Sequence, residues 1–298
     1  MKINGVTIED TFAEAFGMCA TRLIITGDTP GWAHAAAASL SGFATSVIAC
    51  GCEAGIEREL SPGETPDGRP GVAVLIFSMS LKDLQKQVRD RVGQCVLTTA
   101  GSACFSGLDG DETVKIGGAL RYFGDGFQIA KRIGDRRYWR VPVMDGEFIC
   151  EDRAGTAKAV GGGNLIVIAA SRPAALEASE RAVAAMRKTR DVILPFPGGM
   201  VRSGSKVGSK YKALVASTND AYCPTLKGQT KTALPPEAAA VLEIVIDGLT
   251  PNSVREAMRA GISAACTVGA GGGMLKIDAG NYDGKLGKYR FPLREIMA

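Results

Sequence analysis

The 298-residue sequence contains no long hydrophobic run. No apolar stretch approaches the roughly 18 to 20 residues that a membrane-spanning helix needs. The first residues, MKINGVTIEDTF, also lack the apolar segment of a secretory signal. We therefore expect a cytoplasmic protein without membrane association. Hydrophobic residues at 46% and charged residues at 22% indicate a globular chain that forms a core.

Aromatic residues and histidine are scarce. Aromatics make up 6% of the chain and are not interleaved with basic residues, so we expect no nucleic-acid binding. The net charge of +4 suits either an anionic partner or an ordinary mixed surface. The eight cysteines are scattered, with Cys50 and Cys52 in a C-x-C rather than a C-x-x-C pair, and His34 is the only histidine. We predict no metal site, and buried thiols in the reduced state.

Glycine is abundant, with 38 residues, but the known glycine motifs are missing. The stretch SGSKVGSKY from Ser203 lacks the spacing of a phosphate-binding loop, and GAGGGM from Gly269 lacks the final glycine of a dinucleotide-binding turn. A G-x-S-x-G elbow is absent, and one histidine is a poor basis for a catalytic triad. The sequence therefore predicts neither ATP binding, NAD binding nor triad chemistry.

One order of strands and helices occurs twice along the chain. The first copy comprises strand Arg22–Gly27, helix Pro30–Phe43, strands Thr45–Cys50 and Gly71–Phe77, helix Ser80–Gln94 and a strand from Val114 to Ile116. The second comprises strand Leu165–Ala170, helix Pro173–Lys188, strands Asp191–Phe196 and Val241–Ile246, helix Pro251–Ala265 and strand Met274–Ala279. The order β-α-β-β-α-β predicts an α+β protein with two ferredoxin-like lobes, each an antiparallel sheet with two helices on one face.

We place the lobes at residues 1–150 and 151–298. Chance similarity of two α/β halves is the alternative, because short apolar strands resemble one another. Residues Tyr138–Asp152 alternate around Asp145 and Gly146, which predicts an inserted hairpin that bridges the lobes or forms a subunit interface.

The predicted strand Val241–Ile246 (VLEIVI) contains an acid, Glu243. A carboxylate in an apolar strand costs free energy unless it is paired or neutral. A shift of 170 residues places Ala73 at the matching position of the first copy, so such a strand does not require the acid. Glu243 is therefore a solvent-facing residue at a strand edge, a member of a buried ion pair, or a functional carboxyl with a raised pKa.

Several loops have a composition that ordinary turns would not require, although Gly, Asn, Asp and Pro also fill turns. They are NGVTIEDTFAEAF (residues 4–16), ETPDGRPGV (64–72), RYFGDGFQ (121–128), PFPGG (195–199), SKVGSK (205–210), ASTNDAYCPT (216–225) and AGNYDGKLGKY (279–289). Together they resemble the formylmethanofuran:tetrahydromethanopterin formyltransferase family, from Asn4 to about Tyr289.

This resemblance implies two ferredoxin-like lobes and a homotetramer, built as a dimer of dimers, with active sites in clefts near subunit contacts. It implies transfer of a formyl group from the amine of methanofuran to N5 of tetrahydromethanopterin, or a dephospho-type analogue, without a metal or a permanently bound cofactor. Both carriers have polyanionic tails. Archaeal members are strongly acidic, so the net charge of +4 suggests a bacterial homologue of the methylotroph type. Such a protein would act in formaldehyde oxidation to formate, with hydrolase-complex subunits as partners.

The resemblance also favours the catalytic interpretation of Glu243, because the family's catalytic glutamate falls in the matching E-I-V-I strand. Formyl transfer between amines passes through a tetrahedral intermediate with a developing oxyanion. A neutral, buried carboxyl can donate a hydrogen bond or a proton to that oxygen.

We expect the substrates to contact polar and glycine-rich loop positions. These are Asn219 and Ser205 at the oxyanion, Asp220 and Tyr222 at the pterin or furfurylamine, Lys206, Lys210 and Arg69 at carboxylates, and Gly198 and Gly199 in the flexible backbone. Two other functions stay open: a non-catalytic scaffold subunit of a formyltransferase/hydrolase complex, and a ferredoxin-like small-molecule sensor.

Overall fold

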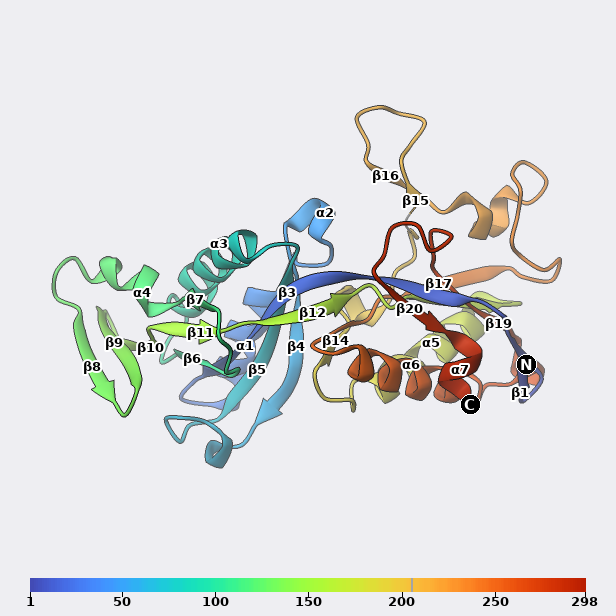
Figure 1. Cartoon of the computed structure of the whole chain (residues 1–298). Coiled ribbons are helices and arrows are strands. Elements are labelled where there is room, and N and C mark those ends of the chain that lie inside the picture. The colour runs from blue at the N-terminus through green and yellow to red at the C-terminus, as the bar shows by residue number, and fades with distance from the viewer. Residues whose placement is uncertain (205) are drawn as a thin grey trace. The chain divides into compact units, whose positions relative to one another are not determined.

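The computed structural model describes residues 1–204 and 206–298, and they form two compact units. Unit 1 comprises residues 1–16 and 160–298, and unit 2 comprises residues 17–159. The chain leaves unit 1 within β3 (Phe12–Thr26) and returns within β12 (Ala157–Gly161) (Figure 1). These units differ from the predicted division at residue 150, because the first residues pair with strands from the C-terminal part of the chain, β19 and β20.

The main sheet of unit 1 has the strand order β1-β2-β19-β13-β17. Its strands are β1 (Lys2–Ile3), β2 (Val6–Ile8), β13 (Leu165–Ala169), β17 (Ala240–Ile244) and β19 (Met274–Ala279). β13 is antiparallel to both of its neighbours, and β2 is parallel to β19. The strands predicted near residues 165, 241 and 274 are therefore confirmed, with small differences at their ends.

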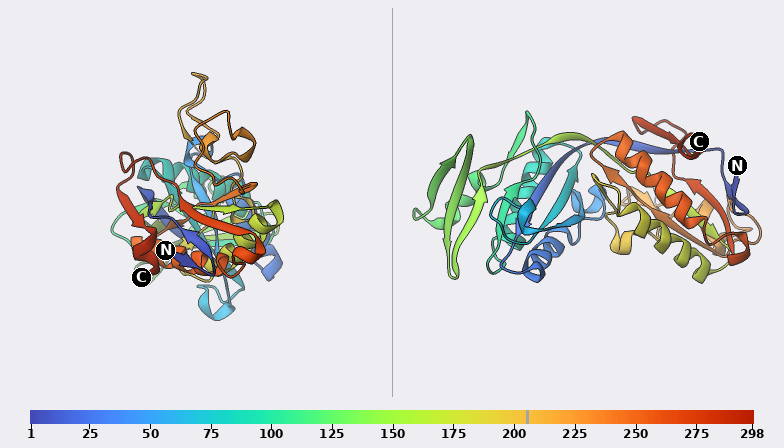
Figure 2. Two further views of the ribbon diagram at one scale, coloured as in Figure 1. Left: turned by 90° about the vertical axis from the view of Figure 1, so that its right-hand side faces the viewer. Right: turned by 90° about the horizontal axis from the view of Figure 1, so that it is seen from below.

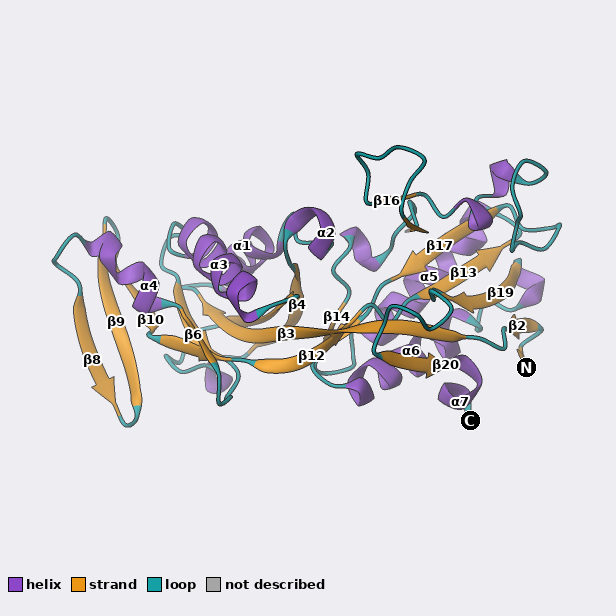
Figure 3. Ribbon diagram, turned by 45° about the horizontal axis from the view of Figure 1, so that its top comes forward, coloured by secondary structure: helices purple, strands orange, loops and turns teal. Residues whose placement is uncertain are grey.

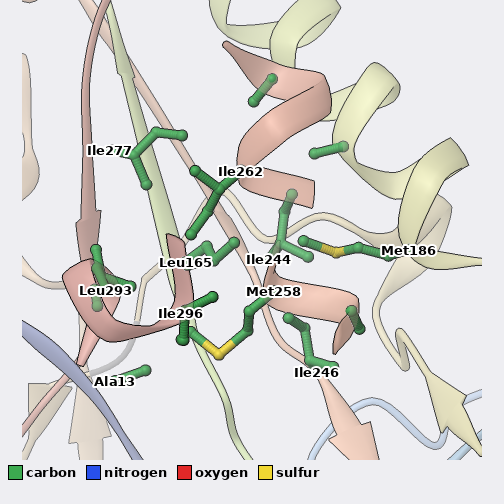
Figure 4. Close-up of a cluster of buried hydrophobic side chains, with 14 of the residues drawn as sticks. Ala13, Leu165, Met186, Ile244, Ile246, Met258, Ile262, Ile277, Leu293 and Ile296 are labelled. Atoms are coloured by element: carbon green, nitrogen blue, oxygen red, sulfur yellow. The ribbon is translucent and has the colours of Figure 1, made fainter. Parts of the chain in front are cut away.

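Two long helices cover one face of this sheet, α5 (Arg172–Met186) and α6 (Pro251–Ala265), which lie side by side in Figure 2. Each begins at a hydroxyl N-cap, Ser171 or Thr250, that accepts a backbone N–H of the first turn. Apolar side chains from the helices and from the facing side of the strands form the core shown in Figure 4: Leu165, Met186, Ile244, Met258, Ile262 and Ile277. Both predicted helices are confirmed, and the alternation of side chains along each strand leaves Glu243 on the opposite face.

Shorter elements complete unit 1. They are β14 (Val192–Ile193), β15 (Lys206–Val207), β16 (Ala216–Ser217), β18 (Asp247–Gly248), β20 (Tyr289–Pro292) and α7 (Leu293–Met297). The strand predicted at Asp191–Phe196 is wrong beyond β14, which pairs with β18. Pro195 lacks the N–H that a ladder needs, and the chain then enters a 3-10 turn at Pro197–Gly199. Long loops follow before β17 (Figure 3).

Unit 2 contains an antiparallel sheet in the order β6-β3-β5-β4. Its elements besides β3 are α1 (Pro30–Ser41), β4 (Glu53–Leu60), β5 (Gly71–Ser78), α3 (Leu81–Arg91) and β6 (Ala103–Ser106). Both helices agree with the predictions, and the side chain of Thr29 caps α1 as expected. Leu84, Val88 and Val92 are fully buried at the predicted helical spacing.

Two predictions for unit 2 are wrong. Residues Thr45–Cys50 do not form a strand, because Ser46 caps the short helix α2 (Val47–Cys50) and Gly51 ends it in the left-handed region. The strand of this region is β4 instead. It lies at the edge of the sheet and contains charged residues, so its sequence lacks the apolar pattern of a buried strand. Val114 lies in β7 (Thr113–Lys115), which pairs with β11 (Arg153–Gly155) in a separate two-stranded sheet, and β6 takes the predicted place beside β3.

The inserted hairpin is confirmed. β9 (Arg136–Val143) and β10 (Gly146–Glu151) are antiparallel, and the turn between them contains Asp145. β8 (Ile129–Ile133) extends this arm on one side, β10 joins it to β6 on the other, and the short helix α4 (Gly117–Leu120) precedes it.

The eight cysteines are free thiols, and Cys52, Cys104, Cys150 and Cys266 are buried. Burial is therefore as expected for these four, whereas Cys19, Cys50, Cys95 and Cys223 are only partly buried. Among the helices of the described chain, none is long and apolar enough to cross a membrane.

Candidate functional site

Glu243 occupies an interior position of unit 1. Glu243 is 8% exposed, and it lies opposite Ile166 of β13 in the antiparallel register. On its other side, its backbone N–H and C=O exchange hydrogen bonds of 2.9 and 2.7 Å with Val201. Glu243 is therefore paired on both sides and does not face solvent from a strand edge. Within residues 1–204 and 206–298, no cation lies within ion-pair distance of its carboxyl, which also rules against the buried ion pair.

The partner of the Glu243 carboxyl is an amide. Nδ2 of Asn164 donates a hydrogen bond of 2.6 Å to Oε1 of Glu243. Asn164 is held in turn by its backbone, because its carbonyl accepts the N–H of Gly280 at 3.2 Å. Its own Oδ1 is buried and has no hydrogen-bond partner among the described residues. A buried amide with one unused acceptor is unusual and marks a polar site inside the sheet face.

Burial raises the pKa of Glu243 above its ordinary value, and the hydrogen bond from Asn164 offsets part of that rise. Desolvation favours the neutral acid, whereas an N–H donor favours the carboxylate. Because desolvation is the larger effect, the site shifts Glu243 toward the protonated state. A carboxyl with this environment can act as a hydrogen-bond donor or a general acid.

Two adjoining pockets open beside this carboxyl, on the face of the sheet away from α5 and α6, and both are lined by Ile166, Asn219, Tyr222 and Glu243. The first is also lined by Val201, Arg202, Ser203, Gly204, Cys223 and Val241. The second is also lined by Asn164, Ala279, Gly280, Asn281 and Tyr282. Leu234 and Ala238 help to hold the covering loop by packing against the same patch of the sheet.

Tyr222 joins the pocket to a second group of charged residues. Burial raises the pKa of its phenol, and the carboxylate of Asp278 adds to that rise. Asp278 pairs with Lys276, whose Nζ lies 3.0 Å from Asp278 and 2.7 Å from Glu9. The phenol is therefore held in its neutral form with its hydroxyl toward Asp278, and it shares the pocket with Glu243.

The predicted site residues fall into distinct groups. Asn219, Tyr222 and Glu243 line one pocket together. Lys206 and Asp220 form an ion pair with 2.5 Å between Nζ and Oδ1, which lowers the pKa of Asp220. Lys210 is exposed in the loop between β15 and β16. Ser205 lies outside the described residues.

Gly198 and Gly199 lie in the 3-10 turn after β14, both with positive φ. A side chain at Gly199 would approach Val183 of α5 to 3.0 Å, so this glycine permits close packing. Arg69 lies in unit 2, where it donates to Asp28 at 2.8 Å, to Asp67 at 2.9 Å and to the carbonyl of Gly101. The guanidinium of Arg69 is therefore already hydrogen-bonded to groups of the protein itself.

Sequence reasoning missed Asn164, Asn281 and Tyr282 as site residues. Asn164 ends the glycine run GGGN, which stands before a strand and matches no nucleotide-binding pattern. Asn281 and Tyr282 lie in AGNYDGKLGKY, whose unusual composition was a signal, but no local pattern indicates that this loop meets Glu243. In the part of the chain that the structure describes, no group of three or more His, Cys, Asp or Glu side chains is placed to hold a metal ion.

Comparison with known proteins identifies the family of this chain. The family model described as formylmethanofuran-tetrahydromethanopterin formyltransferase matches residues 1–143, and the model of the formyltransferase proximal lobe matches residues 146–296. The chain belongs to this formyltransferase family. A formylmethanofuran–tetrahydromethanopterin formyltransferase from Methylococcus capsulatus is 64% identical over 298 residues, covering 100% of both chains.

Two solved structures are similar to the chain along nearly its whole length. The formyltransferase/hydrolase complex from Methylorubrum extorquens, solved with methylofuran, contains a chain with a TM-score of 0.97 and 55% identity, covering 100% of this chain and 99% of that one. The formyltransferase from Methanosarcina barkeri has a TM-score of 0.93 and 47% identity, covering 99% and 100%. The mixed α/β architecture is therefore that of the known formyltransferase structures.

Proposed function

We propose that this chain transfers a formyl group between the amine of a methanofuran-type carrier and N5 of tetrahydromethanopterin or a close analogue. The observation that supports this function most directly is a buried carboxyl, Glu243, with a raised pKa at the wall of a polar pocket. The family and its full-length relatives support the choice of the two carriers as substrates.

In this proposal, the attacking amine adds to the formyl carbon, and the carbonyl oxygen gains negative charge. Neutral Glu243 donates a hydrogen bond or its proton to that oxygen. When the intermediate collapses, the C=O bond re-forms and the oxygen returns its proton to Glu243. The C–N bond to the donor carrier breaks, and its nitrogen takes up the proton that the attacking amine loses, so Glu243 ends neutral. Asn219 supplies a further donor to the oxygen from the same pocket, and Tyr222 contacts the pterin or the furfurylamine.

Substitution of Glu243 by Gln tests this role. Gln keeps the size and can donate a hydrogen bond, but it cannot deliver a proton, so we expect kcat to fall by about 100-fold or more. The measurement is steady-state turnover with formylmethanofuran and tetrahydromethanopterin. Glu151→Gln is a matched control, because Glu151 in unit 2 is also buried and also has a raised pKa.

Near-normal turnover of Glu243→Gln would remove the catalytic assignment. A wild-type chain that binds neither carrier and transfers no formyl group would instead favour a scaffold subunit. Native mass spectrometry that finds another small molecule would favour a sensor.

The proposal extends to the lobes and the assembly. The strand orders β6-β3-β5-β4 and β19-β13-β17 support a ferredoxin-like lobe in each unit. A relative from Methylorubrum extorquens, which is named as one of the subunits of a formyltransferase/hydrolase complex, supports hydrolase subunits as partners. Formate as the product in the cell stays a prediction. The homotetramer built as a dimer of dimers, binding of carboxylates by Lys206, Lys210 and Arg69, and a cytoplasmic location stay predictions.

A further inference from the structure

Glu14 is a buried acid that the proposed chemistry does not use. It lies in the first part of β3, within unit 1, and is 1% exposed. Its neighbours Ala13 and Ala15 belong to the apolar core, so Glu14 points to the other side of the strand. Such a position normally disfavours an ionised carboxylate, which raises the question of what stabilises this one.

Backbone N–H groups of the loop 282–287 stabilise the carboxylate of Glu14. Oε2 of Glu14 accepts the N–H groups of Tyr282 at 2.7 Å and Gly284 at 2.9 Å. Oε1 accepts those of Leu286 at 2.7 Å and of Gly287. Four N–H groups that converge on one point form an anion-binding nest. Here the chain fills the nest with its own carboxylate.

The loop is shaped for this purpose. Asp283 and Gly284 have φ of 58° and 69°, so the backbone curls and turns successive N–H groups inward. A side chain at Gly287 would lie 2.6 Å from Cγ of Glu14, which leaves room only for glycine. Burial acts to raise the pKa of Glu14, and the N–H donors outweigh it and lower that pKa. The carboxylate therefore stays ionised while it holds the loop.

The same loop forms a wall of the pocket. Asn281 and Tyr282 line it beside Glu243 and Asn164. At its start, the Asn281 side chain donates to Oγ1 of Thr11 at 3.1 Å, and Gly280 donates to Asn164. The remainder of the loop closes on Glu14. Loss of the carboxylate would leave several N–H groups without an acceptor and free the segment that carries Tyr282.

We propose that Glu14 is a positioning residue, which fills the nest of residues 282–287 and so holds Asn281 and Tyr282 in place to bind substrate. The proposal rests on the proposed formyl transfer. It assigns Glu14 no contact with the reacting atoms. Its distinguishing consequence is that the nest, once emptied, accepts another small anion.

The test is chemical rescue of Glu14→Ala. We expect KM for at least one carrier to rise about tenfold, because binding must then order two side chains that the loop no longer holds. The pH profile of kcat should not move, because Glu243 keeps its surroundings. Added acetate should restore KM, whereas acetamide, which has the same shape without the charge, should not.

Glu57→Gln is the control for loss of a buried carboxylate, since Glu57 in unit 2 accepts Arg22 at 2.6 and 2.8 Å. That variant should show no response to acetate. A KM unchanged in Glu14→Ala, or raised without any effect of acetate, overturns the proposal.

If Glu14→Ala does not fold, hydrogen exchange of the wild-type protein tests the nest instead. The amides of residues 282–287 should exchange much more slowly than those of the exposed loop 208–215. Equally fast exchange in both loops contradicts the nest. This readout is independent of turnover, so a chain that fails to transfer formyl groups would disprove the proposed function without deciding the role of Glu14.

Discussion

Asn164 and Glu243 lie 79 residues apart in the chain, yet the amide of one donates a 2.6 Å hydrogen bond to the carboxyl of the other. The Oδ1 atom of Asn164 is buried without a partner in the described part of the chain. Rotation of the amide by half a turn would bring Oδ1 to the carboxyl, where it could accept a hydrogen bond from the O–H of neutral Glu243. The pair can therefore satisfy either protonation state of the acid, as a group that exchanges a proton during turnover requires.

Asn164→Ala is expected to shift the pH dependence of formyl transfer. Removal of the N–H donor eliminates the interaction that favours the charged form, so the pKa of Glu243 rises further. Activity that needs the neutral acid is lost as pH rises through this pKa, so the alkaline limb of kcat/KM should move to higher pH. We also expect kcat to fall by about tenfold because the carboxyl is less well oriented.

Asn252→Ala provides the comparison for that profile, because Asn252 donates to Glu256 at 2.8 Å on the exposed side of α6. Its pH profile should match the wild type. An alkaline limb of Asn164→Ala that stays in place or moves to lower pH would contradict the role of Asn164.

The raised pKa of Glu243 also predicts how stability depends on pH. The folded state binds the Glu243 proton more tightly than the unfolded state, so this contribution is full below the unfolded pKa and is lost as pH rises through the folded pKa. Glu243→Gln lacks this titration. The free energy of unfolding of the variant, relative to the wild type, should therefore increase with pH.

Urea unfolding of Glu243→Gln and of the wild type at pH values from about 4 to 8 measures the difference in their free energies of unfolding. This is about the pH range in which folded proteins are most stable. Glu14→Gln should show the opposite slope at the acid end of this series only, because the pKa of Glu14 is lowered and its contribution, complete above the unfolded pKa, is lost as pH falls. A difference between Glu243→Gln and wild type that is constant with pH would contradict a raised pKa.

The segment 201–219 predicts a salt-sensitive step in substrate binding. It contains Arg202, Lys206, Lys210 and Lys212 and no acidic residue. Lys206 is paired with Asp220, whereas Lys210 is exposed. We expect Lys210→Ala to raise KM for a polyanionic carrier by about threefold to tenfold and to weaken the dependence of KM on ionic strength.

Titration of KM with sodium chloride compares Lys210→Ala with Lys82→Ala, an exposed lysine of α3 in unit 2. Lys82→Ala should follow the wild type, and Lys206→Ala should have a smaller effect than Lys210→Ala because its charge is already paired. Identical salt dependence in all of these variants would show that the segment does not bind the carrier tail.

Local sequence was sufficient for most helices and for the buried strands. The hydroxyl caps Thr29 and Thr250, and the proline that follows each, place the starts of α1 and α6 because they satisfy free N–H groups within the first turn. The strand predicted at Thr45–Cys50 failed because Ser46 and Gly51 cap a short helix there. The charged strand β4 was missed because an edge strand need not be apolar.

The strand pairing extends the comparison of the two sequence copies from single strands to the sheets of unit 1 and unit 2. Ala73 lies opposite Ile24, and Ile24 lies opposite Phe105, across three strands of unit 2. The corresponding row of unit 1 is Glu243, Ile166 and Asp278. One sheet therefore carries two acids where the other carries apolar residues at the same places. The match of Glu243 with Ala73 was predictable by a shift along the sequence, but the match of Asp278 with Phe105 required the pairing of strands.

By itself, the sequence determined the family, the helices and central strands of each unit, and the anomaly of an acid in an apolar strand. These features depend on which residues occur and on their spacing along the chain, so the sequence alone is enough to predict them. Only the tertiary structure decided that Glu243 is buried and hydrogen-bonded to Asn164, that Tyr222 and Tyr282 share its pocket, and that Arg69 is held by protein groups in unit 2. Desolvation and hydrogen bonding are set by neighbours far apart in the chain, and these contacts exist only once the sheet and its loops have folded.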